Sequence, residues 1–366
     1  MGHHSSQPSL IRAWSVVWSG CGINFALGII YSWSVFGKAL VEQLQWTKTE
    51  ASIPFTVACL SWGACMMIAG PWLDRVGPKI IILLSSVLAG GGMFIAGTIQ
   101  TVMGITTGFG LMVGAAIGFG YAAGIPAAVK WFMPHKKGLI TGIVVAGFGL
   151  SALVGAPLTN FLIGTFGMAN AFYFEGVIFF FIILVLAQFM AFPPPGYVPY
   201  GGPAPETKTG MASASAVDFS TKQMLRTPQF YLLWLMYCFT ASAGLMIIGN
   251  LATISKIQVN IDWGFYLVAV LAIANSAGRI IAGWSSDKLG RTQTMFGVFL
   301  LQAANMFAFS AYDTPALLLI GAIITGLSYG SVATLFPSAT FDYFGLKNAG
   351  SNYGLVFSGW GAAALI

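Results

Sequence analysis

One basic side chain lies deep inside an apolar stretch of the sequence. Arg279 sits in the run from about Trp263 to Trp284, whereas every other Lys or Arg falls at the edge of such a run or in a loop. A run of this length can cross a membrane as a helix. An isolated guanidinium in hydrocarbon is unfavourable by about 3 kcal/mol or more, so an intramembrane arginine marks a functional site. The chemistry that fits it is the binding of an anion.

The neighbours of Arg279 along the helix leave space for a ligand. Asn275 lies four residues earlier, on the same helix face and about 6 Å away, so we expect it to bind the substrate together with Arg279. Ala272 and Gly283 continue this face with small side chains. A buried salt bridge is the alternative, but of the ten acidic residues only Glu175 falls inside an apolar run. An arginine without such a partner suits a substrate that brings its own carboxylate, which it grips with two parallel hydrogen bonds.

Three tyrosines are the next candidates for a binding site. Tyr121 ends the sequence Gly-Phe-Gly-Tyr in the fourth apolar run, and Tyr329 ends Gly-Leu-Ser-Tyr at the matching place in the tenth. We expect their hydroxyls to face one cavity from opposite walls, with Tyr31 of the first run beside them. The alternative for each tyrosine alone is packing or a position at the membrane interface.

The sequence offers no enzyme chemistry. It has no intramembrane His, no Ser-His-Asp set, no metal-ligand cluster and no phosphate-binding loop, and its glycine runs lie within predicted helices rather than after a strand. The cysteines fall singly in apolar runs, which predicts small packing residues; they are Cys21, Cys59, Cys65 and Cys238. We therefore expect no catalysis, no cofactor and no metal site.

The composition defines the elements that must position these residues. Hydrophobic residues make up 57% of the chain and charged residues 7%, against about 25% charged in soluble proteins. This predicts an all-α, multi-pass membrane protein that is embedded in a lipid bilayer. The net charge of +6 is spread over short loops, so it indicates topology and not a nucleic-acid partner. The apolar segments cover about 13–37, 49–72, 79–99, 103–132, 138–165, 169–192, 228–254, 262–285, 292–311, 315–341 and 350–366.

The distribution of basic residues predicts the orientation. With the N-terminus in the cytoplasm, only Lys38, Lys48 and Lys256 lie on the outer side. Cytoplasmic loops of membrane proteins carry the excess of Lys and Arg. We therefore expect a cytoplasmic N-terminus in a cell inner membrane, with these residues on the inner side: Arg12, Arg75, Lys79, Lys130, Lys136, Lys137, Lys208, Lys222, Arg226, Lys288, Arg291 and Lys347.

The chain contains an internal repeat. The segment Gly70–Gly77 recurs as Gly283–Gly290, 213 residues later, and Trp131-Phe132 recurs as Tyr343-Phe344 at an offset of 212. Two matches at nearly one offset predict two homologous six-helix halves. Residues 193–227 are rich in Pro, Gly, Ser and Thr, as in a linker, and end in a capping-box pattern at Ser220–Gln223. The predicted parts are an N-terminal bundle 1–192, a cytoplasmic linker 193–227, and a C-terminal bundle 228–366 that is truncated in its eleventh helix and lacks the twelfth.

The repeated segment resembles the signature loop of the major facilitator superfamily, G-x-x-x-D-(R/K)-x-G, and residues 130–138 resemble its loop between the fourth and fifth helices. The resemblance covers essentially the whole chain. It implies two pseudo-symmetric six-helix bundles that rock about a substrate near the membrane midplane. We expect Asp74, Arg75, Asp287 and Lys288 to form a charge network that opens and closes during transport. The alternative is a static turn that caps the helix ends.

Within that superfamily the sequence is most similar to bacterial monocarboxylate transporters and oxalate/formate antiporters. The motifs that carry this resemblance are Tyr31-Ser-Trp, Gly-Tyr121, Asn275-Ser-Ala-Gly-Arg279, Ser-Tyr329-Gly and Asn352-Tyr353-Gly. The resemblance implies that Arg279 binds the substrate carboxylate and that Tyr31, Tyr121 and Tyr329 line the site.

Two departures from the family pattern bear on the substrate. The oxalate antiporter has a second intramembrane cation, a Lys in the eleventh helix, whereas Trp360 stands near that place here. One cation matches one negative charge and favours a monocarboxylate over oxalate. Animal monocarboxylate carriers have an Asp one turn before the Arg, and Asn275 replaces it, which weakens the case for proton symport. Glu175 is a possible proton carrier, although its depth, about two turns from the outer end of its helix, favours a solvated interfacial place.

The sequence thus predicts a monomeric secondary transporter of small monocarboxylates such as lactate, pyruvate or acetate, moved with a proton or by exchange. Oxalate/formate exchange is the alternative within this class. A membrane sensor that binds organic acids without transporting them is a more distant alternative.

Overall fold

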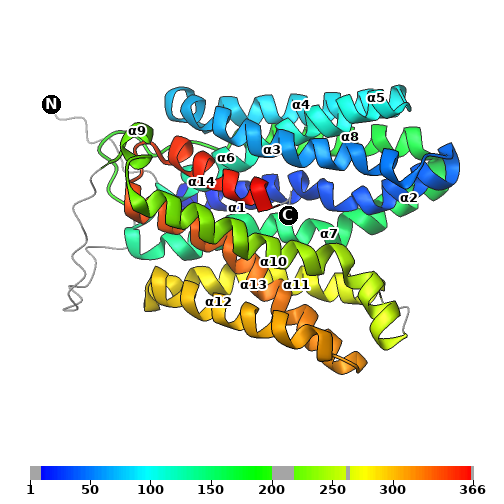
Figure 1. Cartoon of the computed structure of the whole chain (residues 1–366). Helices are drawn as coiled ribbons and strands as arrows, with labels where there is room; N and C mark the ends of the chain where they lie inside the picture. Colours follow the sequence, from blue (N-terminus) through cyan, green and yellow to red (C-terminus); the bar gives the residue numbers. More distant parts are fainter. Residues whose placement is uncertain (1–9, 200–217, 261–263, 364–366) are drawn as a thin grey trace.

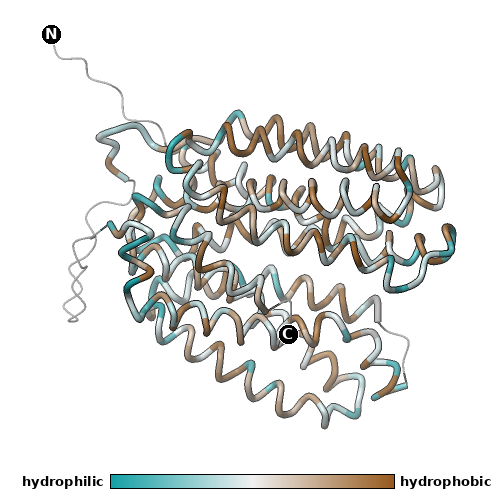
Figure 2. Tube along the Cα trace, turned by 45° about the horizontal axis from the view of Figure 1, so that its top comes forward, coloured by the Kyte–Doolittle hydropathy of each residue, from teal (hydrophilic) through white to brown (hydrophobic). Residues whose placement is uncertain are grey.

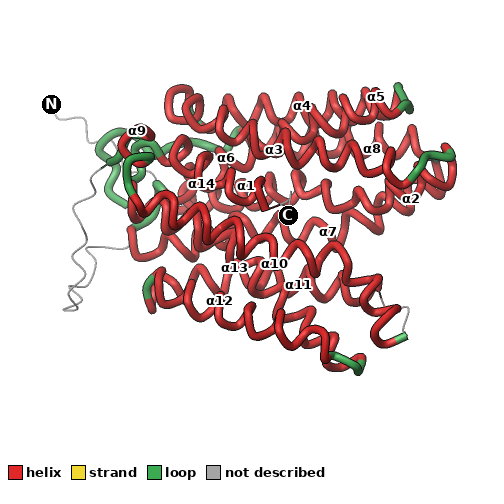
Figure 3. The backbone as a smooth tube through the Cα atoms, viewed as in Figure 1, coloured by secondary structure: helices red, strands yellow, loops and turns green. Residues whose placement is uncertain are grey.

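The computed structural model describes residues 10–199, 218–260 and 264–363, which are helical apart from turns and short loops (Figure 1, Figure 3). Ten of its helices are long and apolar enough to cross a membrane. They match the first ten predicted segments, and the eleventh segment contains helix α14 (Ala349–Ala363). The ten spans are Leu10–Leu44, Lys48–Val76, Pro78–Thr98, Val102–Val129, Pro134–Phe166, Met168–Ala187, Pro228–Leu251, Tyr266–Leu289, Arg291–Ala311 and Pro315–Phe344.

Two groups of helices make up the fold, as the repeat predicts. The first contains α1 (Leu10–Leu27), η1 (Gly28–Ser32), α2 (Trp33–Leu44), α3 (Lys48–Val76), α4 (Pro78–Thr98), α5 (Val102–Ile105), η2 (Thr106–Val113), α6 (Gly114–Val129), η3 (Pro134–Lys136), α7 (Lys137–Phe166) and α8 (Met168–Ala187). The second contains α10 (Pro228–Val259), α11 (Gly264–Leu289), α12 (Arg291–Ala308), η4 (Phe309–Ala311), α13 (Pro315–Phe344) and α14. Figure 2 shows hydrophilic residues gathered toward the ends of the helices and hydrophobic ones between them, as a membrane crossing requires.

Local sequence signals account for several helix starts. Thr47 and Glu50 form a capping box at the start of α3. The predicted capping box at Ser220 and Gln223 is confirmed, and it begins the short helix α9 (Thr221–Met224). Proline occupies the first turn of α4, α10 and α13, where its missing N–H leaves no hydrogen bond unmade. These signals fix where the helices begin.

The first apolar segment differs from its predicted continuous helix. It is longer, from Leu10 to Leu44, and a 3₁₀ turn at Gly28–Ser32 divides it. At Gly28 the backbone lies against Ser151 of α7, so closely that a Cβ at Gly28 would overlap the serine side chain. This close approach needs glycine and brings the turn that carries Tyr31 to the centre of the molecule.

The two groups meet along two pairs of helices, α7 with α11 and α3 with α14. At each pair small residues allow the backbones to touch: Gly138 faces the carbonyl of Gly283, and Gly70 faces that of Gly350. Both contacts lie at the end of the molecule that carries α9, on the left of Figure 1, which we call the linker end. Toward the opposite end, α10 to α13 slope away from the first group (Figure 1). The functional candidates lie between these pairs.

Candidate functional site

Arg279 lies at the contact between the two halves, held by neutral groups. Its side chain is buried, with 3% of the residue exposed. Its Nε donates a hydrogen bond to Asn275 Oδ1 at 3.0 Å, and its Nη1 donates one to the carbonyl oxygen of Val145 on α7 at 2.5 Å. The ring of Phe148, one turn further along α7, lies 5.9 Å from the guanidinium carbon. Among the described residues no carboxylate forms an ion pair with it. No side chain in the described part of the protein therefore neutralises its positive charge.

A small cavity adjoins Arg279. Its volume is about 20 Å³, which is close to the space that one water molecule needs. Tyr31 from η1, Tyr121 from α6 and Tyr329 from α13 all line it, so the predicted tyrosines and Arg279 come together from both halves. The site is thus a small, mostly aromatic cavity with one charged residue in its wall.

Asn275 acts on the arginine and not on the cavity. Its side chain accepts the hydrogen bond from Arg279 Nε, and it is not among the residues that line the cavity. Its backbone carbonyl packs against Gly330 of α13, where a Cβ would overlap it. Asn275 therefore orients the guanidinium from one helical turn away, as the predicted shared face allows.

Several lining residues were not predicted from the sequence. Trp62, Phe148, Tyr237 and Phe357 complete the wall, together with Trp360, Val332 and Ala333. The indole N–H of Trp62 is buried without a hydrogen-bond partner among the described residues, whereas that of Trp360 donates to the Tyr329 hydroxyl at 2.9 Å. The position of Trp360 was expected from the family comparison. The sequence does not identify the other lining residues, because the local sequence of an apolar helix is the same whether a side chain faces lipid, the core or a cavity.

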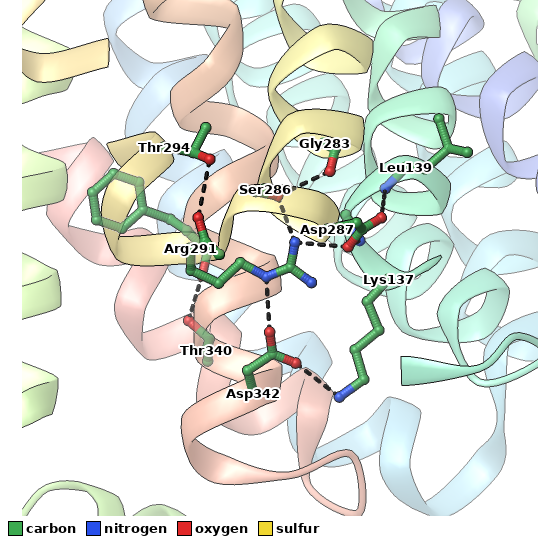
Figure 4. A network of polar contacts seen from close by, with 12 residues as sticks. Lys137, Leu139, Gly283, Ser286, Asp287, Arg291, Thr294, Thr340 and Asp342 are labelled. Carbon is green, nitrogen blue, oxygen red and sulfur yellow. Dashed lines mark hydrogen bonds and ion pairs between the residues drawn. The ribbon is translucent and has the colours of Figure 1, made fainter. Parts of the chain in front are cut away.

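A charge network closes the α7 and α11 contact at the linker end (Figure 4). The carboxylate of Asp287 accepts hydrogen bonds from the backbone N–H groups of Gly138 and Leu139, at 2.8 and 2.7 Å. It thus sits at the N-terminus of α7, where the helix dipole favours a negative charge. Arg291 bridges Asp287 and Asp342, both at 2.8 Å, and Lys137 of the first half pairs with Asp342 at 2.9 Å.

The pseudo-symmetric contact between α3 and α14 is built on Asp74. Its Oδ2 accepts hydrogen bonds from the hydroxyl and the N–H of Ser351, at 2.9 and 3.3 Å, in the first turn of α14. Lys130, just beyond the end of α6, faces the same carboxylate and lies 3.9 Å from the ring of Phe192. Burial lowers the pKa of Lys130, and the charges of Asp74 and Asp218 partly offset this.

The predicted cationic partners differ from the ones observed. Arg75 is exposed and Lys288 lies over the ring of Trp284, 4.0 Å from its centre, so within the described part of the chain neither joins these networks. The reason is helical geometry, because a residue directly after the aspartate points about 100° away from it. Arg291 takes this role instead. It is the first residue of α12, and the turn at Gly290, which has a positive φ of 96°, brings its guanidinium back to Asp287.

The expectation of a solvated Glu175 is wrong. The residue is fully buried on α8, and Thr159 of α7 contacts its Oε1 at 2.5 Å. The face of α8 that carries Glu175 packs against α4 and α7, so the depth along the helix did not determine the exposure. Within the described residues, no cluster of His, Cys, Asp and Glu could hold a metal ion.

The chain is similar to known membrane transporters over most of its length. The model of the Major Facilitator Superfamily matches residues 18–366. Over 345 residues the chain is 29% identical to the uncharacterized MFS-type transporter YhjX of Escherichia coli, covering 93% of this chain and 83% of that protein. It is 26% identical to the oxalate:formate antiporter of Oxalobacter formigenes, covering 92% and 79% of the two chains. The apicoplast pyruvate carrier 1 of Toxoplasma gondii is 23% identical over 71% of this chain and 57% of its own.

The fold also matches a solved structure. The fucose:proton symporter FucP of E. coli superimposes with a TM-score of 0.70, covering 95% of this chain and 89% of that one at 12% identity. At this identity the likeness concerns the fold alone.

Proposed function

This chain belongs to the major facilitator superfamily and is a secondary transporter, and we propose that it carries a small monocarboxylate of the lactate, pyruvate or acetate type. The observation that carries the proposal is Arg279, the one charged residue of the described cavity wall, held by neutral partners at the meeting of the two halves. A carboxylate supplies the missing negative charge and two acceptor oxygens.

The lining of the cavity supports a small substrate with an apolar part. The volume of about 20 Å³ is room for one water molecule, so a carboxylate enters only when the wall rearranges, and that wall is aromatic apart from Arg279, Val332 and Ala333. The free indole N–H of Trp62 can donate to a carboxylate oxygen, and the aromatic rings suit a short carbon skeleton. We infer that the carboxylate lies against Arg279 and that its alkyl group faces the rings.

Oxalate/formate exchange is the second candidate, and the relative from Oxalobacter formigenes favours it. A dicarboxylate brings two negative charges, and the cavity wall offers the guanidinium and no second cation among its described residues. Trp360 donates a neutral N–H to Tyr329 instead. The charge count therefore supports a monocarboxylate over oxalate.

The proposal also covers the orientation of the protein in the membrane and its conformational change during transport. We infer that the linker end faces the cytoplasm of a cell whose inner membrane holds the protein, because the basic residues concentrate there. The aspartate contacts of Asp74 and Asp287 then hold the cytoplasmic side shut, and their release opens the cavity inward. Arg75 and Lys288 take no part in these closing contacts of the described residues.

Binding and uptake by one variant test the proposal. A panel of mono- and dicarboxylates should raise the melting temperature of the purified protein only for its substrates, and labelled lactate should enter proteoliposomes. Arg279→Ala should abolish both effects while the protein still folds. The matched control is Lys256→Ala, which removes an exposed cation of α10 and should leave both unchanged. Uptake that survives Arg279→Ala would contradict the proposal.

A further inference from the structure

A second polar centre lies inside the first half, in the packing between α7 and α8. The carboxyl of Glu175 is fully buried, and its Oε2 has no hydrogen-bond partner among the described residues. Its Oε1 lies 2.5 Å from the hydroxyl oxygen of Thr159, which is itself fully buried. That hydroxyl also lies 2.9 Å from the carbonyl oxygen of Gly155. The carboxyl oxygen of Glu175, the hydroxyl oxygen of Thr159 and the carbonyl oxygen of Gly155 thus form a row of three oxygens in close contact.

The protons available to this row determine the state of the carboxyl. A threonine hydroxyl has one proton, and a backbone carbonyl has none. If Thr159 donates to Gly155, the short contact to Glu175 needs a second proton, which only the carboxyl can hold. A protonated Glu175 then donates to the Thr159 oxygen, and Oε2 becomes a neutral carbonyl oxygen. A neutral oxygen tolerates burial without a partner far better than a charged one.

The surroundings also disfavour a carboxylate at this position. Four elements pack around this part of α8, namely α1, α2, α4 and α7. Among their described residues none of the charged or titratable side chains pairs with Glu175, since its one polar neighbour is Thr159. Tyr173 on α8 itself contacts Thr98. The charged or titratable residues of those four elements are Arg12, Cys21, Lys38, Glu42, Lys79 and Lys137.

Hydroxyl groups lead from this centre toward the Arg279 cavity. Ser151, Gly155 and Thr159 are four residues apart and share one face of α7. A Cβ placed on Gly155 would lie 2.6 Å from the hydroxyl of Ser32 and 3.8 Å from that of Ser151, so both hydroxyls flank this glycine. Ser32 has no hydrogen-bond partner among the described residues, and it directly follows Tyr31 of the cavity wall. These hydroxyls therefore lie between the carboxyl of Glu175 and the turn that carries Tyr31 of the cavity wall.

We propose that Glu175 is the proton-binding site of this transporter, and that the proton it takes up travels in the same cycle as the anion on Arg279. The inference rests on the proposed carboxylate transport, because a monocarboxylate and a proton together cross the membrane as a neutral pair. Thr159 holds the proton at the carboxyl, and Ser32 and Ser151 connect the carboxyl with the cavity. The substrate charge and the proton thus occupy two separate sites. The charge lies at the contact between the two halves, and the proton lies inside the first half.

Two transport measurements in proteoliposomes separate this inference from the proposed function. One is exchange of labelled lactate for lactate at equal pH, which needs the anion site alone. The other is accumulation of labelled lactate driven by an acidic outside, which also needs the proton site. Glu175→Gln mimics the protonated carboxyl, so accumulation should fall to the level of Arg279→Ala while exchange continues. Glu42→Gln, which removes an exposed carboxylate on α2, should keep both. Accumulation that survives Glu175→Gln overturns the inference.

A spectroscopic measurement keeps the test independent of the substrate and of the variant's folding. The infrared spectrum of the wild-type protein at neutral pH should contain the carbonyl band of a buried protonated carboxyl. Thr159→Val removes its hydrogen bond, so the band should shift in frequency and the pH at which it disappears should change. A wild-type spectrum without the band, or a band and titration unaltered by Thr159→Val, overturns the inference. Absence of lactate exchange in the wild type would instead contradict the proposed function.

Discussion

At the scale of single residues, the site depends on neutral groups that hold a charge. Arg279 donates to a side-chain amide and to a backbone carbonyl, and neither removes its net charge. A buried carboxylate partner would have turned the same arginine into a structural ion pair. Asn275 therefore orients the guanidinium without neutralising it, which leaves the charge free for the carboxylate that we propose.

The indole of Trp62 provides a prediction at this scale. Its N–H is a free donor in the cavity wall, and a hydrogen bond to a charged acceptor contributes about 1.5–3 kcal/mol. Trp62→Phe keeps the aromatic wall and removes the donor, so the affinity for the substrate should fall about tenfold or more. Titration of the melting temperature with lactate measures this. Trp72→Phe, on the exposed side of the same helix, is the control. Unchanged affinity in Trp62→Phe would remove this donor from the site.

At the scale of the elements, helix α7 brings the parts together. It receives the Asp287 carboxylate at its N-terminus, offers the Val145 carbonyl to Arg279 in its middle, and carries Thr159 further along. Its glycines let α11 approach this closely. At Gly142 an added Cβ would overlap the backbone carbonyl of Arg279 itself. The position of the guanidinium thus depends on a residue with no side chain.

Substitution of Gly142 tests whether the position of the Arg279 guanidinium depends on the close approach of α7 and α11. Gly142→Val should separate α7 from α11, destabilise the protein by about 1–3 kcal/mol as overpacking does, and weaken substrate binding more than stability alone explains. The readouts are the melting temperature and the lactate affinity of the folded fraction. Gly164→Val on the same helix is the control, because nothing lies within 4 Å of a Cβ placed there. Equal effects of the two substitutions would refute the argument.

Much of this arrangement could be predicted from the sequence. The rest depends on how the helices are turned against one another. Helical periodicity was enough to pair Asn275 with Arg279, and the repeat was enough to bring Tyr121 and Tyr329 to one cavity. The burial of Glu175 could not be predicted, because it depends on how α8 is turned against α4 and α7, not on its own neighbours in sequence. The aromatic wall was missed for the same reason.

At the scale of the whole molecule, two unequal contacts join the halves at the linker end. The Asp287 side is reinforced by Arg291, Lys137 and Asp342, whereas Asp74 meets a serine of α14. Pro78 occupies the place in the first repeat that Arg291 occupies in the second, so the first signature has no matching bridge. The two contacts thus have similar backbones and different charges, and the α7 and α11 contact contains more ion pairs among the described residues than the α3 and α14 contact.

Opening of that contact is measurable. Thr334 is fully buried on α13 with its methyl group near Gly283 at the contact of the halves. In a protein whose native cysteines are replaced by serine, Thr334→Cys should react slowly with a hydrophilic maleimide. Adding Asp287→Asn should speed the reaction several-fold, because the charge at the N-terminus of α7 and its bridge to Arg291 are lost.

The comparison variants make this prediction specific. Asp74→Asn should accelerate the labelling less than Asp287→Asn, because fewer charged partners are released. Asp313→Asn, an exposed carboxylate outside these contacts, should have no effect. Labelling that is equally fast in all four proteins would show that the aspartates do not hold the halves together.

The hydrogen bond from Arg279 to the Val145 carbonyl also bears on net flux. The carbonyl oxygen accepts the hydrogen bond from Arg279 Nη1 that a substrate oxygen would otherwise accept. It therefore acts as an internal stand-in for the substrate while the transporter is empty. Because this oxygen belongs to the first half and the arginine to the second, the stand-in bond also links the halves when nothing is bound. A carrier equipped in this way can reorient without cargo, which predicts unidirectional lactate efflux into a medium that contains no counter-substrate.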